Sequence, residues 1–123
     1  MININQILEE APAKISEFCT KENEAYAMME ARHEEYKRER AKEYFRQKIA
    51  GNCTAKDVEY KLDMDPGLCQ IKDAELLAEV DYRAWRTRKE KAEHLFNAAV
   101  EMGRNQRAEM YSLNDTIMTK EKK

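Results

Sequence analysis

The sequence predicts an all-α fold: a long antiparallel helical hairpin with a short N-terminal helix and a short connecting helix, assembled as a homo-oligomer. Apolar or small residues recur at steps of three and four from Ile71 to Ile117, which is the spacing of a coiled-coil-like helix face. Charged residues make up 37% of the chain, against about a quarter in compact globular domains, which suits long helices that expose most of their residues. No stretch shows the period-two alternation of a strand.

The first half of the chain reads as two helices separated by a proline. Residues 3–11 are predicted as a short helix with an apolar side. Pro12 lacks a backbone N–H, so we expect it to interrupt this helix before a second, long helix over residues 13–50. Gly51 then supplies a stop, because glycine tolerates the left-handed conformation that ends many helices.

The second half contains a short helix and then the longest one. Thr54 is a predicted N-cap for a helix over residues 55–64, with Val58 and Leu62 facing inward. The segment 65–67, Asp-Pro-Gly, is predicted to be a turn, after which a long helix runs from about residue 68 to 118. We predict a single helical domain over residues 1–118 and a disordered tail over residues 119–123.

An antiparallel return brings the two long helices together along their apolar seams. Residues 36–49 are then expected beside residues 68–82, and the segment 83–91 near residues 25–33. A two-helix hairpin buries little surface, so oligomerisation is expected to add core, the alternative being a monomeric three- or four-helix bundle. The residues predicted for the core or an oligomer interface are Ile4, Ile7, Leu8, Tyr26, Met29, Tyr36, Ile71, Tyr82, Trp85, Leu95 and Met102.

Cysteine usage and hydropathy bear on the compartment. The three cysteines are an odd number without Cys-x-x-Cys spacing, which argues against a disulfide framework and for a reducing cytosol. No run of about 18 apolar residues is present, and the N-terminus lacks the basic region of a signal peptide. We therefore expect a cytoplasmic protein with no membrane association, in the host cytoplasm if it is encoded by a phage.

Catalytic motifs are missing from the sequence. Three glycines are too few for a phosphate-cradling loop, and the serines lack a nucleophile-elbow pattern. Glu30 and His33 have the Glu-x-x-His spacing of carboxylate-bridged di-metal bundles, but such a site needs a second copy, and Glu90 and His94 have the wrong spacing. The sequence predicts a protein that is not an enzyme and has no cofactor and no metal.

Two basic runs interleaved with aromatic residues are the main positive signal. Cationic side chains follow a phosphate backbone, and aromatic rings stack on unpaired bases. The alternative is that these charges are solvated faces or form salt bridges between subunits, and that the aromatic residues are core. The predicted nucleic-acid-binding residues are Lys37, Arg38, Arg40, Lys42, Arg46 and Lys48 in the first run and Arg83, Arg86, Arg88 and Lys89 in the second.

Three segments carry a family resemblance: residues 35–45 before the glycine stop, residues 60–65 after it, and residues 80–85 in the long helix. In their order and lengths these segments resemble the UvsY-like recombination mediators of T4-type phages. The resemblance implies a helical subunit that forms a ring-like oligomer, binds single-stranded DNA, helps to displace the single-strand-binding protein and loads the recombinase. The positions it implies for DNA contact are Lys37, Arg38, Arg40, Lys42 and Arg46.

Three functional hypotheses follow. The first is a non-enzymatic, phage-type accessory protein that binds single-stranded DNA and supports recombination or replication. The second is a protein–protein adaptor or inhibitor that acts on a host factor through its charged helices. The third is a purely structural helical oligomer.

Overall fold

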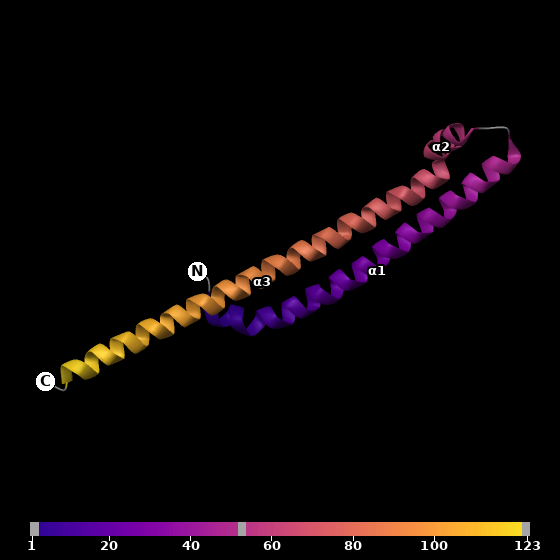
Figure 1. Cartoon of the computed structure of the whole chain (residues 1–123). Coiled ribbons are helices and arrows are strands. Elements are labelled where there is room, and N and C mark those ends of the chain that lie inside the picture. The colour runs from indigo at the N-terminus through magenta and orange to yellow at the C-terminus, as the bar shows by residue number, and fades with distance from the viewer. Residues whose placement is uncertain (1–2, 52–53, 122–123) are drawn as a thin grey trace. The chain divides into compact units, whose positions relative to one another are not determined.

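The chain folds into three helices in a computed structural model, which describes the backbone of residues 3–51 and 54–121 and side chains as far as residue 113. They are α1 (Ile4–Ala50), α2 (Ala55–Asp63) and α3 (Pro66–Glu121), shown in Figure 1. The all-α prediction is confirmed, and the described residues contain no strand. The contacts divide into two compact units, residues 20–86 and residues 1–19 with 87–123, and each is described by itself. The single domain stays a prediction.

Helix α1 continues through Pro12, so the prediction of a separate N-terminal helix over residues 3–11 is wrong. The Asn3 side chain accepts a hydrogen bond from the Gln6 N–H at 3.2 Å and caps the start of the helix. Proline removes one backbone hydrogen bond and crowds the preceding turn, which bends a helix but does not have to end it. Figure 1 shows such a bend in the indigo N-terminal part of α1. The predicted end at residue 50 is confirmed.

Helix α2 begins after the N-cap that the sequence predicts and ends at Asp63, one residue before the predicted end. The Thr54 hydroxyl accepts a hydrogen bond from the Asp57 N–H at 3.3 Å, and Thr54 itself has extended backbone angles. At the other end, the Met64 N–H donates to the Tyr60 carbonyl at 3.2 Å and the Asp65 N–H donates to the Leu62 carbonyl at 3.2 Å. Between these two ends, the buried side chains of Val58 and Leu62 lie on the same side of α2.

Helix α3 begins two residues earlier than predicted, because the Asp-Pro-Gly segment is its first turn and not a separate turn. The Asp65 carboxylate accepts a hydrogen bond from the Leu68 N–H at 3.3 Å, and Pro66 is the first helical residue, where its missing N–H costs nothing. The helix continues through Gly103 and ends at Glu121. Of the predicted tail, residues 119–121 belong to α3, whereas Lys122 and Lys123 lie outside the described residues, so its disorder stays a prediction.

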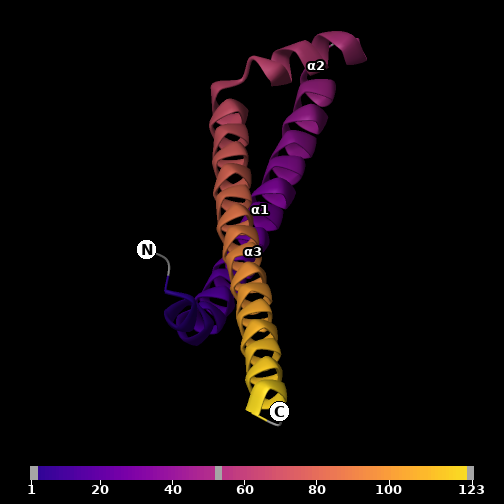
Figure 2. The ribbon, with the colours of Figure 1, turned by 90° about the vertical axis from the view of Figure 1, so that its left-hand side faces the viewer.

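Within residues 20–86, α1 and α3 run antiparallel, and three contacts give their register (Figures 1 and 2). The rings of Tyr26 and Tyr82 lie 5.3 Å apart at 59°, His33 contacts Glu75, and Lys72 lies over the Tyr36 ring. The predicted hairpin is confirmed. The register differs, because residues 26–33 lie beside residues 75–82 and not beside the basic segment that starts at residue 83.

The register is shifted because α2 fills the corner of the hairpin. Leu68, at the start of α3, forms a buried cluster with Val58 and Leu62, and Tyr44 of α1 packs against it. Tyr44 of α1 therefore packs at the corner with α2, and the part of α1 after Tyr36 does not lie along residues 72–82 of α3 as expected. In the other unit, Ala11 and Ala99 are buried, and Ile7 and Leu95 line a cavity of about 120 Å³.

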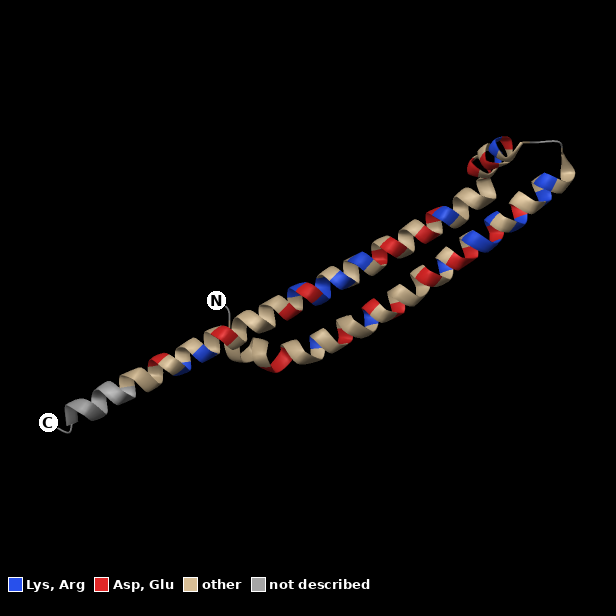
Figure 3. Cartoon of the chain, in the orientation of Figure 1, with Lys and Arg blue, Asp and Glu red and all other residues tan. Residues whose placement is uncertain are grey.

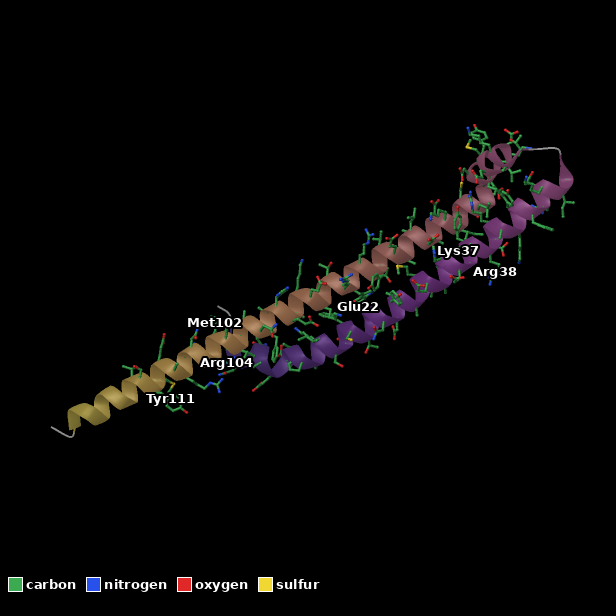
Figure 4. All side chains as sticks on the ribbon, viewed as in Figure 1. Glu22, Lys37, Arg38, Met102, Arg104 and Tyr111 are labelled. Atoms are coloured by element: carbon green, nitrogen blue, oxygen red, sulfur yellow. The ribbon has the colours of Figure 1, made fainter. Side chains whose placement is uncertain are left out.

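The eleven residues predicted for the core or an interface are all at least partly exposed. Most are half-buried along the facing sides of α1 and α3. Tyr26, Leu95 and Met102 are 47%, 48% and 49% exposed, and Figure 4 labels Met102 on α3. The buried apolar positions among the described residues are instead Ala11, Ala25, Val58, Leu62, Leu68 and Ala99, half of them alanines. Whether the half-exposed residues form an oligomer interface stays a prediction.

The corner cluster is expected to dominate the stability of the unit formed by residues 20–86. Leu62→Ala should lower the free energy of unfolding by about 2–4 kcal/mol, because Leu62 is 2% exposed and its loss leaves a cavity. Tyr60→Ala is a matched control on the same helix: Tyr60 is 68% exposed, so the expected change is within about 0.5 kcal/mol. Urea titration followed by circular dichroism measures both, and equal losses would contradict the assignment of the core.

Candidate nucleic-acid interface

A groove on α1, near the corner of the hairpin, collects basic and aromatic side chains. Lys37, Arg40, Tyr44 and Phe45, with Glu59 of α2, line a cavity of about 370 Å³. Arg40, Tyr44 and Phe45 stand three, seven and eight residues after Lys37, and this spacing keeps them on one side of a helix. Phe45 is 68% exposed, an unusual position for a large apolar ring. The groove therefore offers cations beside an accessible aromatic face.

Several cations of the first basic run are paired along α1 itself. Glu39 accepts contacts from Arg38 at 3.9 Å and from Lys42 at 3.4 Å, and Glu43 pairs with Arg46. Figure 3 shows the resulting alternation of blue and red along α1. Exposed pairs of this kind are weak, so these side chains can exchange a carboxylate for another anion at small cost.

Arg40 has a structural role as well as a charge. Its Nη1 donates to Asp63 Oδ1 at 3.1 Å and to the Tyr36 hydroxyl at 3.4 Å, which ties α1 to the end of α2. The hydrogen bond to Asp63 is the main reason that the pKa of Arg40 lies above its ordinary value. By contrast, Lys37 and Lys48 are exposed and form no ion pair with other described residues (Figure 4 labels Lys37 and Arg38). Lys37 is thus the cation of the groove that is most accessible to a ligand.

The structure does not bring the two predicted basic runs together. Tyr36 lies at the level of Lys72, whereas Arg83 is eleven residues further along α3, or roughly 16 Å at 1.5 Å per residue. Arg83 pairs with Glu79, and Arg86 is exposed in the same unit. Arg88 and Lys89 belong to the other unit, where Arg88 is exposed and Lys89 is half-buried. The first run therefore forms a site without the second.

A buried carboxylate joins α1 to α3 beyond the groove. Glu75 is only 8% exposed, and its Oε1 accepts a hydrogen bond from His33 Nδ1 at 2.7 Å while its Oε2 accepts one from Lys72 Nζ at 3.3 Å. Lys72 also lies 4.7 Å from the centre of the Tyr36 ring, a cation–π distance. Burial acts to raise the pKa of Glu75, but the hydrogen bonds from His33 and Lys72 outweigh burial and hold that pKa below its ordinary value of 4.5.

Glu30 and His33, the two residues with the Glu-x-x-His spacing, lie next to this buried carboxylate. One cavity of about 270 Å³ is lined by Glu30 and His33 of α1 and by Glu75 and Glu79 of α3. Helix α3 therefore places two carboxylates near the Glu-x-x-His pair of α1. Even so, no group of three or more potential ligands in the described part of the chain has an arrangement that holds a metal ion. Sequence reasoning missed Glu75, although its position four residues after Ile71 places it on the seam.

Comparisons with known proteins add no assignment. No protein-family model, curated protein or solved structure matches this chain. The resemblance to UvsY-like mediators and the absence of enzymatic activity therefore stay predictions. Among the described residues, none of the helices has the length and apolar character needed to cross a membrane.

Acid should weaken the hairpin through Glu75. A carboxylate whose pKa is lowered by folding adds stability at pH values above its unfolded pKa and loses that contribution as the pH falls through the folded value. The free energy of unfolding should therefore drop below about pH 4.5, and Glu75→Gln should make this drop shallower. Glu59→Gln, at an exposed site on α2, is the control and should leave the slope unchanged. Urea titrations from pH 3 to 7 measure the free energy of unfolding of each variant. An equal dependence of this free energy on pH in wild type and in Glu75→Gln would contradict the prediction.

Proposed function

We propose that this chain is a non-enzymatic accessory protein that binds single-stranded DNA through the groove of α1 and thereby supports recombination or replication. The observation that carries the proposal is the placement of Lys37 and Arg40 beside the exposed ring of Phe45. Cations beside an aromatic face are the combination that binds unpaired nucleic acid without sequence preference.

The electrostatic part of the proposal rests on the local charge of α1. The whole chain has a net charge of -2, but residues 34–48 hold six basic and four acidic side chains. The local excess is positive, and the weak pairs of Arg38, Lys42 and Arg46 can open towards phosphate. Binding of this kind releases counterions, so it should weaken steeply as salt is added.

The aromatic part rests on exposure. A base can stack on Phe45 without displacing packed side chains, because the ring is 68% exposed. Tyr44 lines the same groove while it packs against the corner cluster, so it fixes the groove and is a less accessible partner. Stacking tolerates every base, which fits a protein that coats or hands over DNA of any sequence.

The finer role comes from the family resemblance. A mediator would present single-stranded DNA to a recombinase and compete with the single-strand-binding protein. Several grooves in one homo-oligomer would raise the apparent affinity of each weak site through effective concentration. These partners belong to the proposal and depend on DNA binding being present.

The alternative function is a protein–protein adaptor or inhibitor that acts on a host factor. It is favoured by the alternation of charges on α1, where Glu39 and Glu43 stand among the cations. A surface of mixed sign suits a protein partner with complementary charges better than a uniformly negative polymer. Measurement of oligonucleotide binding separates the two functions.

Fluorescence anisotropy with a labelled single-stranded oligonucleotide tests the proposal. Wild-type affinity should fall linearly on a log–log plot against salt, and Lys37→Glu should reduce the slope by about 0.7, the contribution of one phosphate contact. Phe45→Ala should weaken binding by about 1–3 kcal/mol, the value of one stacked base. Because both side chains are exposed, the helical circular dichroism of the variants should match that of the wild type.

Lys56→Glu is the matched control for charge. Lys56 is exposed on α2 and lies outside the residues that line the groove, and its reversal changes the net charge by the same amount as Lys37→Glu. It should leave the slope unchanged. Absence of wild-type binding at low salt would rule out the proposal and favour the adaptor, whereas equal effects of Lys37→Glu and Lys56→Glu would mean that the site lies elsewhere.

A further inference from the structure

The outward side of α3 in the unit of residues 20–86 holds a stripe of exposed apolar side chains. Leu76, Leu77 and Val80 are 47%, 70% and 64% exposed, and Ala84 is exposed as well. Their spacing keeps them together on a helix of 3.6 residues per turn. The opposite side of the same turns holds Glu75 and Tyr82, which face α1. The apolar stripe Leu76–Ala84 is therefore distinct from the seam of the hairpin.

We propose that the apolar stripe Leu76–Ala84 is the contact between two copies of this chain, which pair through antiparallel α3 helices. This inference does not rest on DNA binding. None of the four stripe residues is among those that the sequence predicts for an interface. The proposed contact lies on the outer side of α3, away from the seam with α1.

The small core of the unit is the first argument for a second copy. Among the described residues of the unit, the buried apolar side chains are Ala25, Val58, Leu62 and Leu68. Three of these lie at the corner, so the paired part of α1 and α3 is held largely by half-buried and polar contacts. Three large apolar side chains in water beside so small a core are a sign of an interaction site. A second copy buries them and supplies the missing core.

Charge supplies the second argument and the orientation. Asp73 lies four residues before Leu77 and Arg83 lies three residues after Val80, so these two opposite charges stand at opposite ends of the stripe, with the carboxylate of Asp81 also at the second end. In an antiparallel pair centred between Leu77 and Val80, Leu77 of one copy meets Val80 of the other. Asp73 then lies beside Arg83 of the other copy, twice by symmetry, whereas a parallel pair would oppose like charges.

Arg83 can serve this contact while keeping its own pair. Its guanidinium forms an ion pair with Glu79 one turn away on the same helix. A guanidinium has five N–H donors, so a second carboxylate can be accommodated at the rim of the stripe.

Sedimentation equilibrium of the full chain tests the pairing. Wild-type protein should be dimeric or larger at micromolar concentration, and Leu77→Glu with Val80→Glu should raise the dissociation constant by roughly a hundredfold or more, because two carboxylates from each copy would be buried without partners. Met64→Glu is the control, because Met64 is an apolar residue that is 65% exposed and lies outside the stripe. This substitution should leave the dissociation constant of the dimer unchanged. Circular dichroism should show unchanged helix content in each variant.

A charge swap tests the antiparallel arrangement. Asp73→Arg should weaken association about tenfold, and the combination with Arg83→Asp should restore it, because the swapped pair has the same complementarity. A monomeric wild type would overturn the proposal and leave the stripe for a partner of a different sequence. Association that survives Leu77→Glu with Val80→Glu, or a double swap that weakens it further, would overturn it too.

Discussion

The packing of α2 into the corner between α1 and α3 is the constraint on which the rest of the described structure depends. Val58 and Leu62 are buried against Leu68, which holds the start of α3 next to α2. The register of the hairpin follows, since it sets Tyr36 beside Lys72 and His33 beside Glu75. The same packing places Tyr44 of α1 against the corner cluster, and the neighbouring ring of Phe45, which lines the groove, is left in solvent.

Away from that corner, the two long helices are held by polar as much as by apolar contacts. Glu75 is buried on the seam, where a leucine would be the ordinary choice, and it is stable there because His33 and Lys72 hydrogen-bond to it. A buried polar group specifies one partner and so selects a register, but it adds less stability than an apolar pair. This accounts for a hairpin with a defined register and little core.

The helices, the Thr54 cap and the inward side of α2 could be predicted from sequence, because each depends on residues within one or two turns. Register could not be predicted, since it depends on α2 packing between elements that are distant in the chain. Pro12 and the Asp-Pro-Gly segment differ from the expectation because a proline can stop a helix, bend it or occupy its first position, and its presence alone does not say which. The basic residues of the groove were predictable as a run, but the exposure of Phe45 and the pairing of Arg40 with Asp63 required the fold.

A hairpin of two helices has two outward sides, and those of this chain differ in chemistry. On α1 the groove carries cations and an exposed ring, whereas the stripe on α3 is apolar with one acidic and one basic end. Ligands that suit one of these surfaces do not suit the other, because apolar side chains gain nothing from phosphate and cations lose hydration in an apolar contact. Pairing through α3 therefore leaves the groove of each copy accessible, so DNA binding and self-association would reinforce each other through avidity.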